Sequence, residues 1–288
     1  MSKTVLITGA STGFGRDTAE TLARAGHNVF ASMRDPKVKN RAHADALQAK
    51  GIEVVELDVT DTQSIDQAVA TVVAKAGRID VLINNAGVAS AGVSEAFTDE
   101  QVTALFDVNV IGVHRVTRAV LPTLRRQKDG LIINIGTILG RVTFPFFGIY
   151  GASKFAVEAL TDSLRYEVSQ LGVDVALVQP SAYPTQMYAS ASQPADAGRV
   201  AEYGEVGEIP GAMFQHFMTL FESSDAPNPQ DIAEAISTLI DAPKGTRPAR
   251  TVVGTSFGAD TLNDAIAPVQ AEVVKGLGLG HLETVTNA

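Results

Sequence analysis

Two kinds of sequence pattern alternate along the first 180 residues of the chain. Short, nearly continuous runs of apolar and β-branched residues recur, which is the pattern of parallel strands buried on both faces. The segments between them carry apolar residues at helical spacing. The apolar runs cover residues 4–8, 28–31, 53–59, 81–84, 131–135 and 173–178, and the helical segments cover 16–25, 41–50, 64–76, 99–126 and 151–171.

This alternation predicts an α/β fold, a doubly wound parallel sheet with helices on both faces. A further apolar run at 251–255 brings the sheet to about seven strands. No repeat or polar linker divides the sequence, so we expect one domain over residues 1–288. Residues 256–288 form a C-terminal extension in this interpretation, with a helix at 260–275 that Pro268 complicates.

The pattern of residues changes after the sixth apolar run. Residues 189–211 are rich in Ala, Ser, Gly and Glu without a clear period, whereas Phe214, Phe217 and Phe221 share one face of a helix. We interpret residues 186–226 as an inserted lid over an apolar substrate pocket, because open α/β sheets bind ligands beyond the carboxyl ends of their strands. A small surface helix packed on the core is the alternative.

Charge and composition narrow the range of partners. The chain has 23 Lys and Arg against 32 Asp and Glu, a net charge of −9, which disfavours nucleic acids and anionic membranes as partners. Cysteine is absent, and no two of the five histidines are three or four residues apart, so we expect no metal site. No apolar run approaches the ~18–20 residues of a membrane helix. We therefore expect a cytoplasmic protein.

A glycine-rich turn, TGASTGFG at 8–15, follows the first predicted strand and opens the first helix. Its glycines, Gly9, Gly13 and Gly15, permit a tight turn and close approach of the backbone to a pyrophosphate, and the helix N-terminus offers free N–H groups. Glycine turns after strands are common, so the strand–turn–helix context carries the prediction of a dinucleotide site.

Tyr150 and Lys154 lie four residues apart and share a face if a helix begins near Tyr150. A phenol is a weak acid at neutral pH unless its anion is stabilised, which a nearby ammonium group does. The pair is therefore a candidate proton-transfer site. An ordinary surface pair is the alternative.

These motifs together resemble a known family. In chain order they are the glycine turn, NNAG at 84–87, Asn109 in a predicted helix, and Tyr150 with Lys154. The chain resembles the single-domain branch of the short-chain dehydrogenase/reductases along about residues 3–190. Phe14 and the stretch 30–36 are similar to the hydroxysteroid and retinol dehydrogenases of that family. The resemblance implies a Rossmann-type fold and an oxidoreductase.

The resemblance implies catalytic roles at four positions. Tyr150 would exchange a proton with a carbonyl or alcohol, and Lys154 would bind the nicotinamide ribose and lower the pKa of Tyr150. Asn109 would hold a water that links Lys154 to solvent. Thr137 stands where the family usually has Ser, and it keeps the hydroxyl that bonds the carbonyl while adding a methyl group. We expect activity to persist in a reshaped pocket, and loss of activity is the alternative.

The resemblance also implies a cofactor site. Thr185 would bind the nicotinamide carboxamide, and Ser181 replaces the usual Gly, which puts the local backbone path in question. Asp58 would bind the adenine edge, although a strand-end Asp that caps the next turn is nearly as good an interpretation. The other residues implied to contact the cofactor are Gly9, Ser11, Thr12, Gly13, Phe14, Gly15, Val59, Asn85, Ala86, Gly87, Tyr150, Lys154, Pro180 and Tyr183.

The end of the second predicted strand bears on the choice of cofactor. An acidic residue there would bind the adenosine 2′-hydroxyl of NAD, but the two residues before Arg34 carry no carboxylate. The Arg34 guanidinium suits a 2′-phosphate, and Ser11 adds a hydrogen-bond donor. Against this, Thr12 stands where NADP-binding members often carry a base, and Asp35 follows Arg34. We predict NADP(H), with NAD(H) as the alternative.

The substrate pocket is harder to define from sequence. Five residues are predicted to line it, namely Thr137, Leu139, Phe147, Tyr150 and Met187. The cluster FPFF at 144–147 is either pocket wall or a core or subunit contact. As pocket wall, it would favour a bulky, apolar substrate.

The sequence thus predicts an NADP(H)-dependent oxidoreductase that interconverts a carbonyl and an alcohol on a small molecule. A catalytically weak or inactive nucleotide-sensing protein of the same fold is the alternative, supported by Thr137 and Ser181. The resemblance further suggests a homodimer or homotetramer formed through the helices predicted at 99–126 and 151–171.

Overall fold

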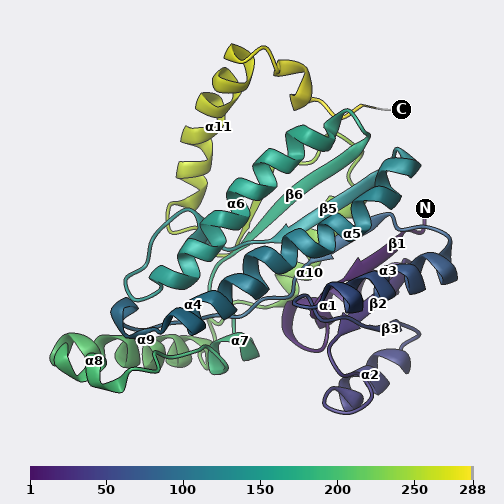
Figure 1. Cartoon of the computed structure of the whole chain (residues 1–288). Helices are drawn as coiled ribbons and strands as arrows, with labels where there is room; N and C mark the ends of the chain where they lie inside the picture. Colours follow the sequence, from purple (N-terminus) through teal and green to yellow (C-terminus); the bar gives the residue numbers. More distant parts are fainter. Residues whose placement is uncertain (287–288) are drawn as a thin grey trace.

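A computed structural model describes residues 1–286 and contains one sheet of seven parallel strands (Figure 1). Their order is β3-β2-β1-β4-β5-β6-β7, so the direction of winding reverses between β1 and β4. The predicted doubly wound α/β fold is confirmed. The strands are β1 (Thr4–Ile7), β2 (Asn28–Met33), β3 (Glu53–Glu56), β4 (Val81–Asn84), β5 (Gly130–Ile135), β6 (Val173–Pro180) and β7 (Arg250–Val253).

Helices cover both faces of the sheet, because successive strand residues point to opposite sides. Val5 and Ile7 of β1 pack in the core under α1, α2 and α10, whereas Leu6 packs in the core under α3, α5 and α6. The helices are α1 (Gly13–Arg24), α2 (Arg41–Gln48), α3 (Thr62–Ala76), α4 (Asp99–Phe106), α5 (Gly112–Gln127), α6 (Gly148–Ser169), α7 (Gln186–Ala189), α8 (Ala197–Glu202), α9 (Glu205–Phe221), α10 (Gln230–Asp241) and α11 (Ala259–Gly276).

The helix predicted at 99–126 is interrupted in the structure. A π-helical turn, Asp107–Ile111, separates α4 from α5 and contains Asn109. Such turns contain one residue more than an α-helical turn and are frequent at functional sites. Pro268, by contrast, lies inside α11 without ending it.

The segment after β6 is more helical than its composition indicated. Residues 189–211, which showed no period, include α8 and the first turns of α9. Figure 1 shows α8 and α9 beyond the carboxyl ends of the strands. No helix within residues 1–286 is both long and apolar enough to cross a membrane.

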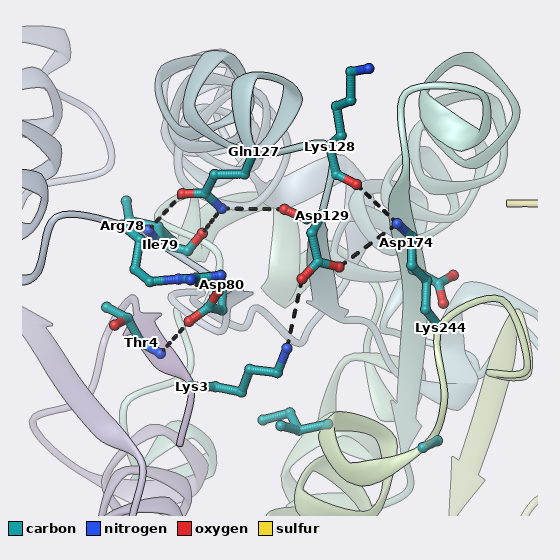
Figure 2. Close-up of polar contacts among 12 residues, drawn as sticks. Lys3, Thr4, Arg78, Ile79, Asp80, Gln127, Lys128, Asp129, Asp174 and Lys244 are labelled. Atoms are coloured by element: carbon teal, nitrogen blue, oxygen red, sulfur yellow. Dashed lines mark hydrogen bonds and ion pairs between the residues drawn. The ribbon is translucent and has the colours of Figure 1, made fainter. Parts of the chain in front are cut away.

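At the amino ends of the strands, polar groups pair within the chain (Figure 2). The carboxylate of Asp129 lies 3.8 Å from the ammonium groups of both Lys3 and Lys244. The Gln127 amide donates a hydrogen bond of 2.6 Å to the Ile79 carbonyl. The side chains named in the sequence motifs lie at the opposite edge.

Candidate active site

The glycine turn has the shape that its sequence predicts. Gly9 and Gly13 have φ angles of +67° and +54°, a region that side chains disfavour. A Cβ on Gly9 would lie 2.8 Å from the Ala86 Cα, and one on Gly15 would overlap the Asn85 amide. The side chain of Thr12 makes no capping hydrogen bond to α1, so the first N–H groups of this helix are available to an anion.

The segment after β4 holds this turn in place. The Asn85 amide donates to the carbonyls of Thr8 and Gly9 at 2.9 and 3.0 Å. One residue earlier, the Asn84 amide donates to the Asn134 side chain at 2.9 Å and ties β4 to β5. Asn84 is therefore structural, whereas Asn85 fixes the wall of a cleft.

That cleft measures about 330 Å³ and begins at the glycine turn. Gly15 does not line the cleft itself but packs against Asn85, which does. Four other predicted cofactor residues line the adjoining cavity, namely Tyr150, Lys154, Pro180 and Tyr183. The predicted cofactor residues that line the cleft are Gly9, Ser11, Thr12, Gly13, Phe14, Arg34, Asp58, Val59, Asn85, Ala86, Gly87 and Thr185. Met33, one of the two residues before Arg34 considered for cofactor choice, lines the cleft too, as does Met187, which was predicted for the substrate. The lining residues that the sequence did not predict are Lys39, Asn40, Leu57, Val88, Val108, Gln186 and Ser190.

Lys39 reaches the cleft because the loop after β2 folds back on itself. Asp35 has a φ of +44°, and its carbonyl accepts a hydrogen bond of 3.0 Å from the Asn40 backbone N–H. The Asn40 side chain also donates to the Arg34 carbonyl at 2.6 Å. Two cations, Arg34 and Lys39, therefore line the same part of the chain's cleft.

Asp58 caps the turn after β3 and also lines the cleft. Its Oδ1 accepts hydrogen bonds from the Thr60 N–H and hydroxyl at 2.9 and 2.7 Å, which caps the turn after β3. The same residue lines the cleft, and it is the one acidic residue among the described residues that do so.

A second cavity, about 90 Å³ and mainly apolar, adjoins the cleft and contains Tyr150. The Tyr150 side chain is buried, and its Oη lies 4.0 Å from the Met187 sulfur. Burial raises the pKa of Tyr150, and the neighbouring Tyr188 phenol raises it further. Thr137, Leu139 and Met187, all predicted for the substrate site, line this cavity as well.

Lys154 lies on the same buried face of α6 as Tyr150, as the four-residue spacing predicts. Its Nζ donates to the Ile135 carbonyl at 2.9 Å and lies 5.8 Å from the centre of the Tyr150 ring. Burial lowers the pKa of Lys154 to about 8. An ammonium group has three donors, so this contact leaves two for a ligand.

Asn109 packs beside this pair from the π-helical turn. Its amide group exchanges two hydrogen bonds of 2.9 Å with the backbone of Val88 and donates to the Ser153 hydroxyl at 3.1 Å. A Cβ on Gly87 would lie 3.3 Å from Asn109 Oδ1 and 3.8 Å from Lys154 Nζ, so both side chains border Gly87.

Thr137 has an extended backbone, with φ −172°, at the carboxyl end of β5. Its hydroxyl donates to the Pro180 carbonyl at 3.0 Å and accepts from the Leu139 N–H at 3.4 Å. The hydroxyl therefore borders the cavity of Tyr150, but a bond to a substrate oxygen requires its hydrogen to rotate away from Pro180.

Ser181 fits because a glycine, Gly254, directly follows the neighbouring strand β7. The Ser181 N–H donates to the Val253 carbonyl at 3.0 Å. Gly254 has a φ of +86°, and a Cβ there would overlap Ser181 Oγ. Tyr183, two residues on, is 1% exposed and packs edge-on against Phe14 with ring centres 5.6 Å apart.

In the FPFF cluster, one phenylalanine forms pocket wall and another makes a packing contact elsewhere in the chain. Phe147 lines the cavity of Tyr150. Phe144 packs edge-on against Phe257 of the C-terminal extension, with ring centres 5.4 Å apart. Phe214 and Phe217 of α9 line the cavity from the other side, so aromatic rings from two distant segments meet there.

A buried polar network continues along α6 beyond Lys154. The Glu158 carboxylate, 3% exposed, accepts from Arg250 at 2.8 Å, from Gln179 at 2.6 Å and pairs with Arg141 at 3.2 Å. Asn263 of α11 donates to the Gln179 side chain at 2.7 Å. Burial raises the pKa of Glu158, and both arginines oppose that rise.

Comparisons with known proteins agree with this geometry. A sequence model of the short chain dehydrogenase family matches residues 3–196. The 3-ketodihydrosphingosine reductase of Bacteroides thetaiotaomicron is 40% identical over 181 residues, which are 63% of this chain and 64% of that protein. The chain thus spans just under two thirds of that relative. Human 17-beta-hydroxysteroid dehydrogenase type 1 is 33% identical over 258 residues, which are 85% of this chain and 76% of that protein.

Solved structures show the same similarity. A short-chain dehydrogenase from Streptomyces avermitilis has a TM-score of 0.77 at 31% identity, over 98% of both chains. A Thermococcus sibiricus alcohol dehydrogenase in complex with 5-hydroxy-NADP has a TM-score of 0.69 at 27% identity, over 88% of this chain and 96% of that one. A Burkholderia phymatum relative in complex with NAD has a TM-score of 0.75 at 26% identity, over 93% and 95% of the two chains.

Proposed function

The chain belongs to the short-chain dehydrogenase/reductase family, and we propose that it is an oxidoreductase that interconverts a carbonyl and an alcohol with NADP(H). One observation carries the proposal. Tyr150 and Lys154, both buried, line a cavity that opens beside the cleft of the glycine turn. A proton donor, an ammonium group and a cleft at a glycine turn therefore meet at the carboxyl edge of the sheet.

The cleft fits a nicotinamide dinucleotide. The free N–H groups of α1 would bind its pyrophosphate, and Gly9 and Gly15 leave room where a side chain would collide. The nicotinamide ring, when bound, supplies or accepts the hydride. Thr185, which lines both the cleft and the cavity, would contact that ring, and Asp58 would face the adenine end.

The protein's own residues would handle the proton. Tyr150 would donate it to the substrate oxygen during reduction, and Lys154 would favour the phenolate that remains. Asn109, held by Val88 and Ser153, would keep the π-helical turn and Gly87 in position beside Lys154. The Thr137 hydroxyl would turn from Pro180 to the substrate oxygen and hold it against Tyr150.

Arg34 and Lys39 support the preference for NADP(H). Two cations on one wall of the cleft would neutralise the charge of a 2′-phosphate. The residues at the end of β2, Ser32 and Met33, offer no carboxylate to a 2′-hydroxyl, and Ser32 is already bonded to the Ile7 carbonyl at 2.9 Å. The charge around the cleft thus favours the phosphorylated cofactor.

The apolar lining of the second cavity supports a bulky, apolar substrate. Leu139 and Phe147 come from the β5 side, and Phe214 and Phe217 come from α9. We propose that residues 186–226 form a lid, since every residue of α9 retains some solvent exposure and part of one face lines the cavity. The outer faces of α5 and α6 would pair in a homodimer or homotetramer, and on α6 Phe155 and Leu160 are both 41% exposed.

The function is tested by following reduced-nicotinamide absorbance with a panel of aryl ketones, a steroid ketone, retinal and aliphatic aldehydes. NADPH and NADH are supplied separately. Carbonyl-dependent oxidation, faster with NADPH, is the expected result. Saturable NADPH binding without oxidation by any compound would instead favour the nucleotide-sensing alternative. Oligomeric state is read from sedimentation of the same sample, with Leu160→Glu expected to shift it towards the monomer.

A further inference from the structure

A second phenol, Tyr188, lines the cavity that contains Tyr150. It belongs to α7 and directly follows Met187, whose sulfur lies 4.0 Å from the Tyr150 hydroxyl. The Tyr188 ring packs against Phe217 and Phe221 of α9, with ring centres 5.8 and 5.1 Å away. Its position is therefore fixed by aromatic contacts.

The hydroxyl of Tyr188 is the part of the side chain that packing does not explain. A phenylalanine would make the same contacts with Phe217 and Phe221. Burial alone raises the pKa of Tyr188 to about 12, with no hydrogen bond from the described residues contributing. The Tyr188 side chain is partly exposed, and its hydroxyl makes no hydrogen bond to another described residue, so it is available to a ligand that enters the cavity.

The two phenols line the same cavity of about 90 Å³. Leu139, Phe147 and Phe214 give the cavity apolar surface, and the Thr137 hydroxyl lies in its lining as well. Because Tyr150 and Thr137 are assigned to the reacting oxygen, Tyr188 is a further hydrogen-bonding group in a mainly apolar cavity.

We infer that Tyr188 is a specificity-determining residue that donates a hydrogen bond to a second oxygen of the substrate, near the reacting carbonyl. The inference rests on the proposed function, because Tyr150 has to bind the first oxygen. The substrate class is an apolar-chain ketone with a second oxygen acceptor. A 3-oxo ester and a hydroxy ketone share this chemistry and differ in the spacing of the two oxygens.

The test compares three ketones of one chain length, namely a plain ketone, a 3-oxo ester and a 2-hydroxy ketone. Values of kcat/KM with NADPH are measured for wild type and for Tyr188→Phe, which removes one oxygen and keeps the ring. Tyr203→Phe is the matched control, because that tyrosine is 37% exposed and bonds Glu95 away from the cavity. The same ketones are titrated by calorimetry onto the NADP⁺-saturated proteins, which reads binding without turnover.

Wild type is expected to favour one of the oxygenated ketones over the plain ketone about tenfold, as one added hydrogen bond provides. Tyr188→Phe is expected to lose that preference and keep the rate on the plain ketone, while Tyr203→Phe changes neither. An equal fall on all three ketones, or an unchanged preference, would overturn the role of Tyr188. Discrimination in calorimetry without turnover by any protein would overturn the proposed function and leave the Tyr188 site standing.

Discussion

The Lys154 ammonium group donates to the Ile135 carbonyl at 2.9 Å, joining the second turn of α6 to the last residue of β5. This contact fixes the ammonium group beside Tyr150, yet it satisfies one donor of three. The rest of the cost of burying a charge is not compensated within the chain, and the lowered pKa of Lys154 reflects that cost. A ligand with hydroxyl or phosphate oxygens would supply the missing acceptors.

Lys154 should therefore make the stability of the cofactor-free protein depend on pH. Its pKa is about 8 in the folded chain and 10.5 ordinarily. Between these values the unfolded chain binds the proton and the folded chain does not, so stability rises with pH across that window. Below pH 8 the full cost applies, about 3 kcal/mol from the size of the shift.

The measurement is urea unfolding at several pH values between 7 and 10 for wild type and Lys154→Met. We expect the variant to lack the rise in the free energy of unfolding that wild type shows above pH 8. Lys75→Met is the control, since that ammonium group is 52% exposed and pairs with Glu53 at the surface. Parallel pH curves for wild type and Lys154→Met would rule out the account of Lys154.

Thr137 should tolerate loss of its methyl group but not of its hydroxyl. Thr137→Ser keeps the donor that would turn from Pro180 to the substrate, and kcat should stay within a few-fold of wild type. Thr137→Val has a similar shape and no donor, and kcat should fall by about 10²–10³. Steady-state rates with one ketone decide the matter, and equal rates for the Val and Ser variants would remove Thr137 from the reaction.

Two loop lysines provide a matched test of cofactor preference. Lys39 lines the cleft, whereas Lys37, two residues earlier in the same loop, does not. Lys39→Ala should lower kcat/KM for NADPH about tenfold and leave that for NADH unchanged, and Lys37→Ala should affect neither. Met33→Asp should shift the preference towards NADH by supplying a carboxylate at the end of β2. An unchanged NADPH/NADH ratio in Lys39→Ala and Met33→Asp would contradict the proposed basis of that preference.

Arg250 should contribute strongly to stability. Arg250→Met leaves the buried Glu158 carboxylate with one cation fewer, and we expect the free energy of unfolding to fall by about 3 kcal/mol. Arg199→Met is the comparison, because Arg199 is 54% exposed in its pairs with Glu95 and Asp196 and its loss should leave Tm almost unchanged. Similar Tm values for the two variants would show that the network adds no stability.

The strands and the glycine turn could be predicted because their signals are local. A strand buried on both faces, such as β6, is apolar along most of its length, and a left-handed turn at Gly9 favours glycine. The spacing of Tyr150 and Lys154 fixes their common face once α6 exists. The family resemblance inferred from these motifs is confirmed by the match over residues 3–196.

Other features depend on contacts between distant segments. The apolar period at 99–126 continues through the π-helical turn, so the sequence pattern does not reveal the turn. The feature that accompanies the turn is the set of hydrogen bonds from Asn109 to Val88 and Ser153. Lys39 reaches the cleft through the backbone reversal at Asp35, which the sequence of the loop does not predict. A basic residue a few positions after Arg34 was the available signal.

The proposed reaction requires Tyr150 to exchange the proton with the substrate oxygen. Carbonyl-dependent NADPH oxidation and NADPH affinity, measured for wild type and Tyr150→Phe, test this role. We expect unchanged affinity and a kcat lower by about 10²–10⁴ in the variant. Oxidation of NADPH by Tyr150→Phe at the wild-type rate would contradict this role.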